Sequence, residues 1–158
     1  MHNAENIVAV GYVVNDDPDS ENIKKLVDAL TAHEGLAVDT VDALDPAHFT
    51  ACLDLGHCGL VGDNAGAMIR QMGSRLGCLH IHDNDNFNDS HTLPYTSAMD
   101  WDDILHALGE IDYQGHFTYE ADNFIRDFPE DLLPACEKFM HDVGRSMMSK
   151  IEKYRVKK

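Results

Sequence analysis

Residues 78–91 constrain this chain more than any other stretch of its sequence. The segment reads Cys-Leu-His-Ile-His-Asp-Asn-Asp-Asn-Phe-Asn-Asp-Ser-His and holds three histidines and three aspartates. The apolar run from Leu76 to Ile81 predicts a strand that delivers His80 and His82 to its end, where a polar loop follows. Open α/β folds present ligands on the loops that follow their strands, and imidazole together with carboxylate suits divalent cations. The segment therefore indicates a metal or catalytic site in an α/β protein.

Size and charge limit the remaining possibilities. With 158 residues, 44% hydrophobic and 25% charged, we expect one globular domain over residues 1–158. A net charge of −16 repels phosphates and anionic lipid, which argues against nucleic acid or membrane as a partner. We see no signal-peptide pattern, no apolar run of roughly 20 residues and no CxxC spacing, so we expect a cytoplasmic protein with reduced thiols.

Apolar patterning predicts strands and helices in alternation. Predicted strands lie at residues 7–14, 49–53, 78–82 and 116–120. Predicted helices lie at about 20–33, at 63–76, from Asp100 onward and from Pro129 onward. Alternation of this kind indicates parallel strands that are joined by right-handed crossovers.

Side chains that can bind metal recur at the predicted strand ends. They are Glu5; Asp54 and His57; His80, His82 and Asp83; Glu120; and, on the loop after the third strand, Asp89 and His91. Each alone has a structural interpretation as a turn former, a core histidine or a surface carboxylate. The ends of parallel strands lie on one face, however, so these groups can converge. Mixed carboxylate and imidazole ligands suit Mn²⁺, Mg²⁺, Co²⁺ or Zn²⁺.

Short motifs surround these residues in a fixed order along residues 4–122. They are Ala4-Glu-Asn6, Cys52-Leu-Asp-Leu-Gly-His57, Leu79-His-Ile-His-Asp-Asn84, Asp89-Ser-His91 with Leu93-Pro-Tyr95, Met99-Asp-Trp101, Tyr113-Gln-Gly115 and Thr118-Tyr-Glu120. Together they resemble the sugar-phosphate isomerase/epimerase family, which has the xylose isomerase-like TIM barrel and also contains the endonuclease IV type of apurinic endonuclease.

The resemblance implies a fold and a set of site residues. The fold is α/β, with parallel (βα) units equivalent to strands 5–8 of a TIM barrel, a half-barrel that a homodimer would complete. The implied metal ligands are Glu5, Asp54, His80 and Glu120; the implied acid/base pair is Glu5 and Glu120; the implied substrate contacts are His57 and His82; and the implied further metal ligands are His57, Asp89 and His91.

The implied activity is divalent-metal-dependent isomerisation or epimerisation of a small sugar, sugar phosphate or polyol. A cation on the carbonyl and hydroxyl oxygens would stabilise an enediolate, and two glutamates on opposite sides would remove and return the proton. The ketose 3-epimerase branch places an arginine soon after this histidine loop. Residues 84–87 are Asn-Asp-Asn-Phe, which argues against that branch.

Two alternatives remain open at the level of sequence. One is an endonuclease IV-like metal phosphodiesterase, which Asp89 and His91 favour and the net charge opposes. The other is a non-catalytic half-barrel that acts as a fragment or an assembly module. Because the motifs match only the second half of the family barrel, the sequence leaves open whether this chain is an enzyme.

Overall fold

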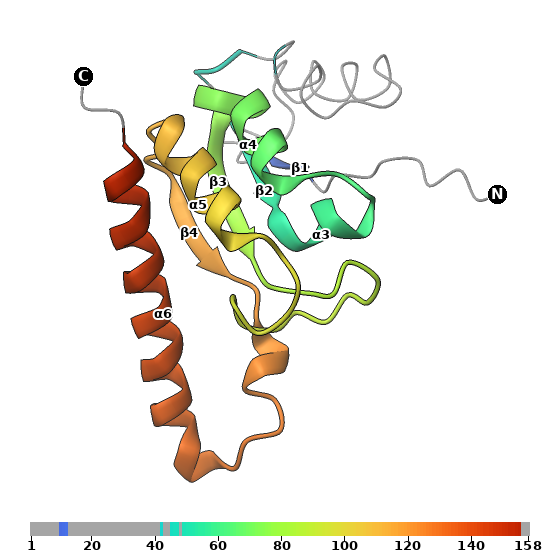
Figure 1. The fold of residues 1–158 in the computed structure, drawn as a ribbon, viewed down its shortest axis with the longest axis vertical. Helices are drawn as coiled ribbons and strands as arrows, with labels where there is room; N and C mark the ends of the chain where they lie inside the picture. Colours follow the sequence, from blue (N-terminus) through green and yellow to red (C-terminus); the bar gives the residue numbers. More distant parts are fainter. Residues whose placement is uncertain (1–9, 13–41, 43–44, 48, 156–158) are drawn as a thin grey trace, which may run out of the picture.

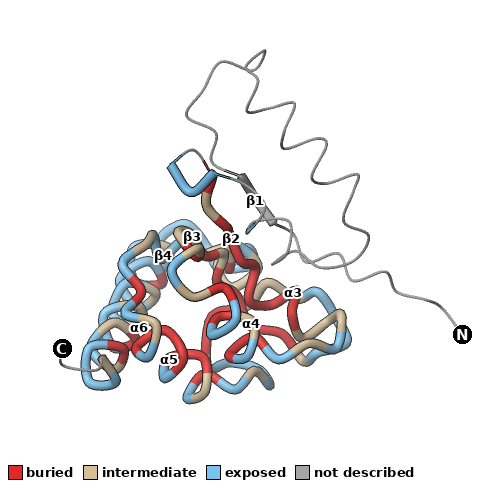
Figure 2. Tube along the Cα trace, turned by 90° about the horizontal axis from the view of Figure 1, so that it is seen from above, coloured by how far each residue is buried: buried red, intermediate tan, exposed pale blue. Residues whose placement is uncertain are grey.

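The structure, a computed structural model, describes residues 10–12, 42, 45–47 and 49–155. Helices cover one face of a four-stranded sheet (Figure 1, and from above in Figure 2). The strands are β1 (Val10–Tyr12), β2 (Ala51–Asp54), β3 (Leu76–Ile81) and β4 (His116–Tyr119). The helices are α3 (Leu55–Leu60), α4 (Ala65–Met72), α5 (Trp101–Glu110) and α6 (Leu133–Tyr154), with short 3-10 turns η1 (Gly73–Arg75), η2 (Asp122–Phe124) and η3 (Glu130–Leu132).

The strand order is β1-β2-β3-β4, and β2, β3 and β4 are parallel, as the alternating pattern predicts. The register pairs Asp54 with His80 and His80 with Thr118. β1 lies inside the predicted strand 7–14 but runs antiparallel to β2, which differs from the all-parallel expectation. An antiparallel neighbour also satisfies the backbone groups of an edge strand, so the direction of β1 does not follow from strand propensity. The predicted helix 20–33 and the strand expected before Glu5 lie outside the described residues.

One face of the sheet forms the core with the helices. Leu53, Leu79 and Ile81 are fully buried and belong to a cluster that includes side chains of α4, α5 and α6. Because side chains alternate along a strand, Asp54 and His80 project from the opposite face. The sheet thus separates the apolar core from the polar side chains at the strand ends.

Capping residues explain where the helices begin and end. Asn64 accepts from the backbone N–H of the third residue of α4, and Asp100 does the same for α5. Helix α4 ends before the predicted boundary at residue 76, and Leu76 begins β3, as the apolar run from Leu76 to Ile81 predicts. The helix ends at Met72 because Gly73 adopts a φ of 51°, a conformation that breaks helical hydrogen bonding.

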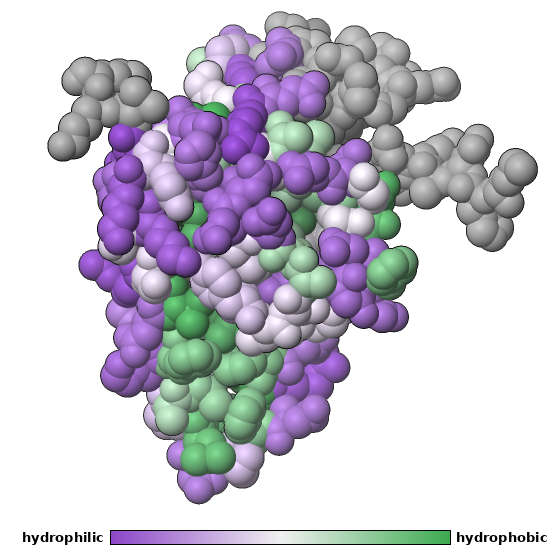
Figure 3. Space-filling view, in the orientation of Figure 1, coloured by the Kyte–Doolittle hydropathy of each residue, from purple (hydrophilic) through white to green (hydrophobic). Residues whose placement is uncertain are grey.

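Helix α6 begins close to the predicted position, with Pro134 in its first turn, where a missing N–H costs little. Only Cys136, Met147 and Ile151 of this helix are buried. Figure 3 shows apolar side chains gathered over the first half of α6 and the segment before it, where Phe128 and Phe139 are exposed. No helix in the described part of the chain combines the length and the apolar character needed to cross a bilayer.

Candidate metal centre

The three parallel strands bring polar side chains to one edge of the sheet, the edge formed by the carboxyl-terminal ends of the strands. Asp54 ends β2, His82 follows β3 and Glu120 follows β4. The backbone N–H of Glu120 donates to the Ile81 carbonyl at 3.0 Å, which continues the ladder between β3 and β4. The loop after β3 folds back over this edge, where His91 Nδ1 lies 2.8 Å from the Glu120 carbonyl oxygen. Side chains 66 positions apart in sequence, from Asp54 to Glu120, thus share one site.

Asp54 and His82 form the buried half of the site. Asp54 is 3% exposed and His82 is 0% exposed, and His82 Nε2 lies 3.0 Å from Asp54 Oδ1. His57 Nδ1 lies 3.0 Å from the other carboxylate oxygen, Oδ2. Asp54 also caps α3 by accepting from the His57 backbone N–H at 3.1 Å. Burial raises the pKa of Asp54, but the hydrogen bonds and charges of His82 and His57 outweigh it, so the pKa falls below its usual value.

The His82 ring is tightly enclosed. It stacks on the His91 ring with 3.9 Å between centroids and 4° between planes. Gly56 lies against its edge, because a Cβ there would fall 2.0 Å from His82 Cε1. The Nδ1 atom of His82 is buried and has no hydrogen-bond partner in the structure. Leaving a buried imidazole nitrogen unpaired is costly, so its persistence suits a residue that binds a ligand.

His57, Asp89 and His91 form a second group beside His82. Asp89 Oδ2 lies 3.4 Å from His57 Nε2, and Asp89 Oδ1 lies 3.1 Å from His91 Nε2. His91 has a φ of 43°, a left-handed conformation that is uncommon outside glycine. Burial lowers the pKa of His91, but the Glu120 carbonyl and the charges of Asp89 and Glu120 outweigh it, and the pKa is raised overall.

His80 and Glu120 form the open half of the site. His80 Nδ1 lies 3.1 Å from Glu120 Oε2, with side chains 44% and 42% exposed. Both can therefore be reached from solvent, unlike His82 two residues further along the chain.

Among the described residues, two sets of side chains could each hold a cation, because the ligand atoms within each set lie within 4.8 Å of one another. The first set is Asp54, His82 and Glu120, and the second is His57, His82, Asp89 and His91. Imidazole nitrogens and carboxylate oxygens fit Mn²⁺, Co²⁺ or Zn²⁺, and the unpaired Nδ1 of His82 is consistent with a ligand site.

The structure brings some of the predicted ligands together and not others. It brings Asp54 and Glu120 together and places His80 against Glu120, but His80 belongs to neither set. His82, predicted to contact substrate, belongs to both sets. Glu5 lies outside the described residues.

The buried carboxylate of Asp83, which the sequence offered as a metal-binding group or a turn former, instead holds the loop after β3 in place. It is 0% exposed and accepts from the backbone N–H groups of Ser97 and Met99, both at 3.1 Å, and from Trp101 Nε1 at 2.8 Å. These bonds close the loop that carries Asp89 and His91. No spacing rule could have identified them, because two of the three donors are backbone amides far along the loop.

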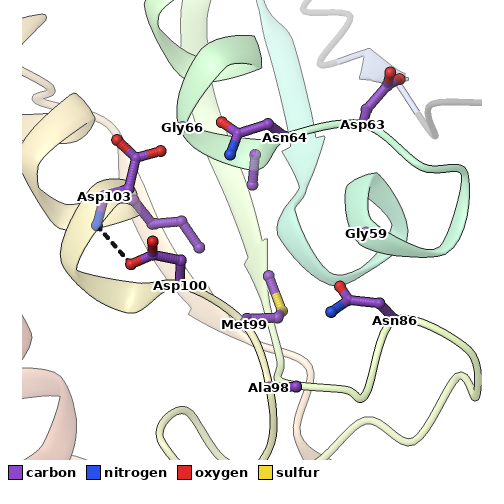
Figure 4. A pocket seen from close by; sticks show the side chains of 11 residues that line it. Gly59, Asp63, Asn64, Gly66, Asn86, Ala98, Met99, Asp100 and Asp103 are labelled. Atoms are coloured by element: carbon purple, nitrogen blue, oxygen red, sulfur yellow. Dashed lines mark hydrogen bonds between the residues drawn. The ribbon is translucent and has the colours of Figure 1, made fainter.

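A hollow between α3, α4 and α5 lies beside the site (Figure 4). Three of its polar side chains have structural partners. Asp100 accepts from the Asp103 backbone N–H at 3.1 Å, and Asn64 accepts from the Ala67 backbone N–H at 2.6 Å. Arg70 donates to Asp103 at 2.8 Å. Helix capping explains Asn64 and Asp100, and an ion pair with Arg70 explains Asp103.

The chain is similar to known proteins in both sequence and fold. A profile of the xylose isomerase-like TIM barrel family matches residues 19–135. The chain is 33% identical over 84 residues to a D-psicose 3-epimerase of Enterocloster bolteae, covering 53% of this chain and 26% of that protein. It is 33% identical over 96 residues to a D-psicose 3-epimerase of Ruminiclostridium cellulolyticum, covering 61% and 30%.

The fold is similar to the crystal structure of a D-tagatose 3-epimerase-like protein, with a TM-score of 0.57 and 17% identity. That match covers 77% of this chain and 45% of the other, so the chain spans less than half the length of these relatives. The named relatives are 3-epimerases, the branch against which the absent arginine argues. The parallel α/β sheet, the site at its strand ends and the match over residues 19–135 lead to one conclusion: the chain belongs to the xylose isomerase-like TIM barrel family.

Proposed function

We propose that this chain carries the divalent-metal site of a sugar isomerase or epimerase. The observation that carries the proposal is the convergence of Asp54, His82 and Glu120, whose ligand atoms lie within 4.8 Å although they come from three different strand ends. Family membership supports this, and the names of the relatives support a small ketose as substrate.

Asp54 is the best placed carboxylate ligand. Its lowered pKa keeps it charged at neutral pH, and its two oxygens are held by His82 and His57. Glu120 and, outside the described residues, Glu5 would add carboxylates, and His80 or His82 would add an imidazole. The contacts among His57, Asp89 and His91 support a place for a further ion.

When bound, the cation would polarise the sugar carbonyl and offset the negative charge that develops as the neighbouring C–H bond loses its proton. Glu120 would move that proton, because its carboxylate is accessible and His80 holds one of its oxygens. Glu5, which lies outside the described residues, would be the second acid/base group, as the resemblance implies. His57, which is 30% exposed and fixed by Asp54, would contact a substrate hydroxyl.

Elemental analysis after dialysis against Mn²⁺, Co²⁺ or Zn²⁺ tests the metal site, and deuterium uptake from heavy water into D-psicose or D-tagatose, read by NMR, tests proton transfer. We expect a retained ion and deuterium exchange in the parent chain. Glu120→Gln should keep much of the ion and lose exchange, whereas Asp54→Ala should lose both. A parent chain without metal, or a Glu120→Gln variant with full exchange, would contradict the proposal.

An endonuclease IV-like phosphodiesterase is the second candidate. The Asp89 carboxylate between His57 and His91 favours it, because clustered metal ions suit phosphodiester cleavage. The net charge of −16 opposes DNA binding. Metal-dependent nicking of an abasic duplex, lost in Asp89→Ala, would replace the isomerase proposal with this one.

A further inference from the structure

Asn84 is a fully buried amide beside the metal centre. It follows Asp83 in the loop after β3 and is 0% exposed. Its Nδ2 donates to the Gly56 carbonyl at 2.9 Å, and its Oδ1 accepts from the Asn86 backbone N–H at 2.9 Å. Its own carbonyl accepts from the Ala98 backbone N–H at 3.0 Å. A buried amide that is bonded at both ends of its side chain holds in place the groups that it touches.

The peptide group between Gly56 and His57 is held from two sides. Asn84 donates to its carbonyl, and Asp54 Oδ1 accepts from its N–H at 3.1 Å. This peptide lies in the first turn of α3, so the two side chains tie the start of that helix to the ends of β2 and β3. The backbone there cannot shift without breaking a hydrogen bond to a buried side chain, which is costly.

Gly56 in turn lies against the His82 ring. A Cβ at residue 56 would fall 2.0 Å from Cε1 and 2.4 Å from Nε2 of that ring. The ring has little room to move away, because His91 stacks on it at 3.9 Å and Asp54 Oδ1 lies 3.0 Å from its Nε2. The Gly56 backbone therefore forms one wall of the slot that holds the imidazole.

We propose that Asn84 is a positioning residue, which acts through Gly56 to fix the orientation of the His82 ring. The consequence for an ion rests on the proposed function, whereas the orientation of the ring is a property of the metal-free chain. Groups that orient a ligating histidine are typically worth about tenfold to a hundredfold in metal affinity. The contacts that carry the inference lie within residues 54–98.

Imidazole nitrogen shifts of the metal-free protein, read by long-range proton–nitrogen NMR, test the ring orientation. The His82 signal is the one that His82→Ala lacks. We expect one tautomer in the parent chain, with its hydrogen on Nε2 and donated to Asp54. Asn84→Asp, studied at about pH 8 to ionise its carboxyl group, keeps the side-chain shape but turns a repelling oxygen toward the Gly56 carbonyl. Its His82 shifts should move toward the average of the two tautomers, and those of Asn84→Ala should do the same.

Titration with Co²⁺, followed by visible absorbance, tests the consequence for the ion. Asn84→Asp should weaken Co²⁺ binding about tenfold to a hundredfold and alter the absorption spectrum, because the orientation of the ligands sets both. Gly56→Ala should act in the same way, since its methyl group presses directly on the ring. Because both changes act on one ring, the double variant should be weakened by less than the product of the two single effects.

Two variants are matched controls. Asn64→Asp makes the same substitution at an exposed helix cap whose acceptor role it keeps. Tyr113→Phe removes a hydrogen bond of 2.6 Å to the His116 carbonyl, at the amino-terminal end of β4. Both should keep the His82 shifts and the Co²⁺ affinity of the parent chain.

His82 shifts that stay unchanged in both Asn84 variants, or that move equally in Tyr113→Phe, would overturn the proposal. A parent chain that binds no Co²⁺ would instead contradict the proposed function, and the NMR comparison would still decide the role of Asn84.

Discussion

His80 and His82 stand two residues apart on the same side of one strand, yet the protein treats them differently. His82 is completely buried, stacked on His91 and bonded to Asp54. His80 is 44% exposed, and its acidic contact among the described residues is Glu120. The contrast separates a buried half of the site, whose geometry is fixed by packing, from an open half that a substrate can reach.

The two carboxylates Asp54 and Glu120 differ in burial in the same way as the two histidines. Asp54 is 3% exposed and held by several donors, whereas Glu120 is 42% exposed. A carboxylate that stays charged and immobile suits a metal ligand, and an accessible one suits proton transfer. The buried half is therefore expected to govern stability and ion binding, and the open half to govern chemistry.

Removing the buried support of the loop should have the largest effect on stability. Asp83→Ala leaves the donors of Ser97, Met99 and Trp101 without their acceptor. We expect a loss of about 3–5 kcal/mol in unfolding free energy, measured by urea denaturation. Asp85→Ala is the control, since among the described residues that partly exposed side chain bonds to its neighbours Phe87 and Asn88. Equal losses of unfolding free energy in the two variants would show that burial does not determine how much each carboxylate contributes to stability.

Replacing each of the two histidines by alanine tests the comparison between the buried and the open half directly. His82→Ala should lower the unfolding free energy of the metal-free protein by about 2 kcal/mol, because it opens a cavity and leaves Asp54 with one partner fewer. His80→Ala should change it by less than about 0.5 kcal/mol. Thermal melts with and without metal, together with ion content, measure both effects. If His80→Ala loses more bound ion than His82→Ala, the open half supplies the main imidazole ligand.

The smallest expected effect is on pH dependence. The pKa of His91 is raised above its ordinary 6.5, so its contribution to stability is complete below that value and is lost as pH rises through the folded pKa. The metal-free protein should therefore lose a little stability as pH rises above 6.5, and His91→Gln should remove this slope. The affinity for a cation should instead rise with pH, because cations displace protons from imidazole. A parent slope unchanged in His91→Gln would assign the titration to another group.

Sequence pattern predicted much of the architecture. Strands β2, β3 and β4 appear within a few residues of their expected places, and α5 begins directly after Asp100, where a helix was expected. The pattern missed α3, which begins directly after β2, because the six residues Leu55–Leu60 include two glycines and carry no helical signal. Helix formation there depends on Asp54, which serves as the cap and as a candidate ligand.

The sequence by itself determined which residue types reach the ends of the strands, because a period of two fixes the face and an apolar run fixes the strand. Only the tertiary structure decided which of them are enclosed. Asp54 and Gly56 from one segment and His91 from another surround His82, and no local pattern encodes contacts between distant segments. Burial, and with it the division of the site into a fixed half and an open half, is therefore a property of the packed chain.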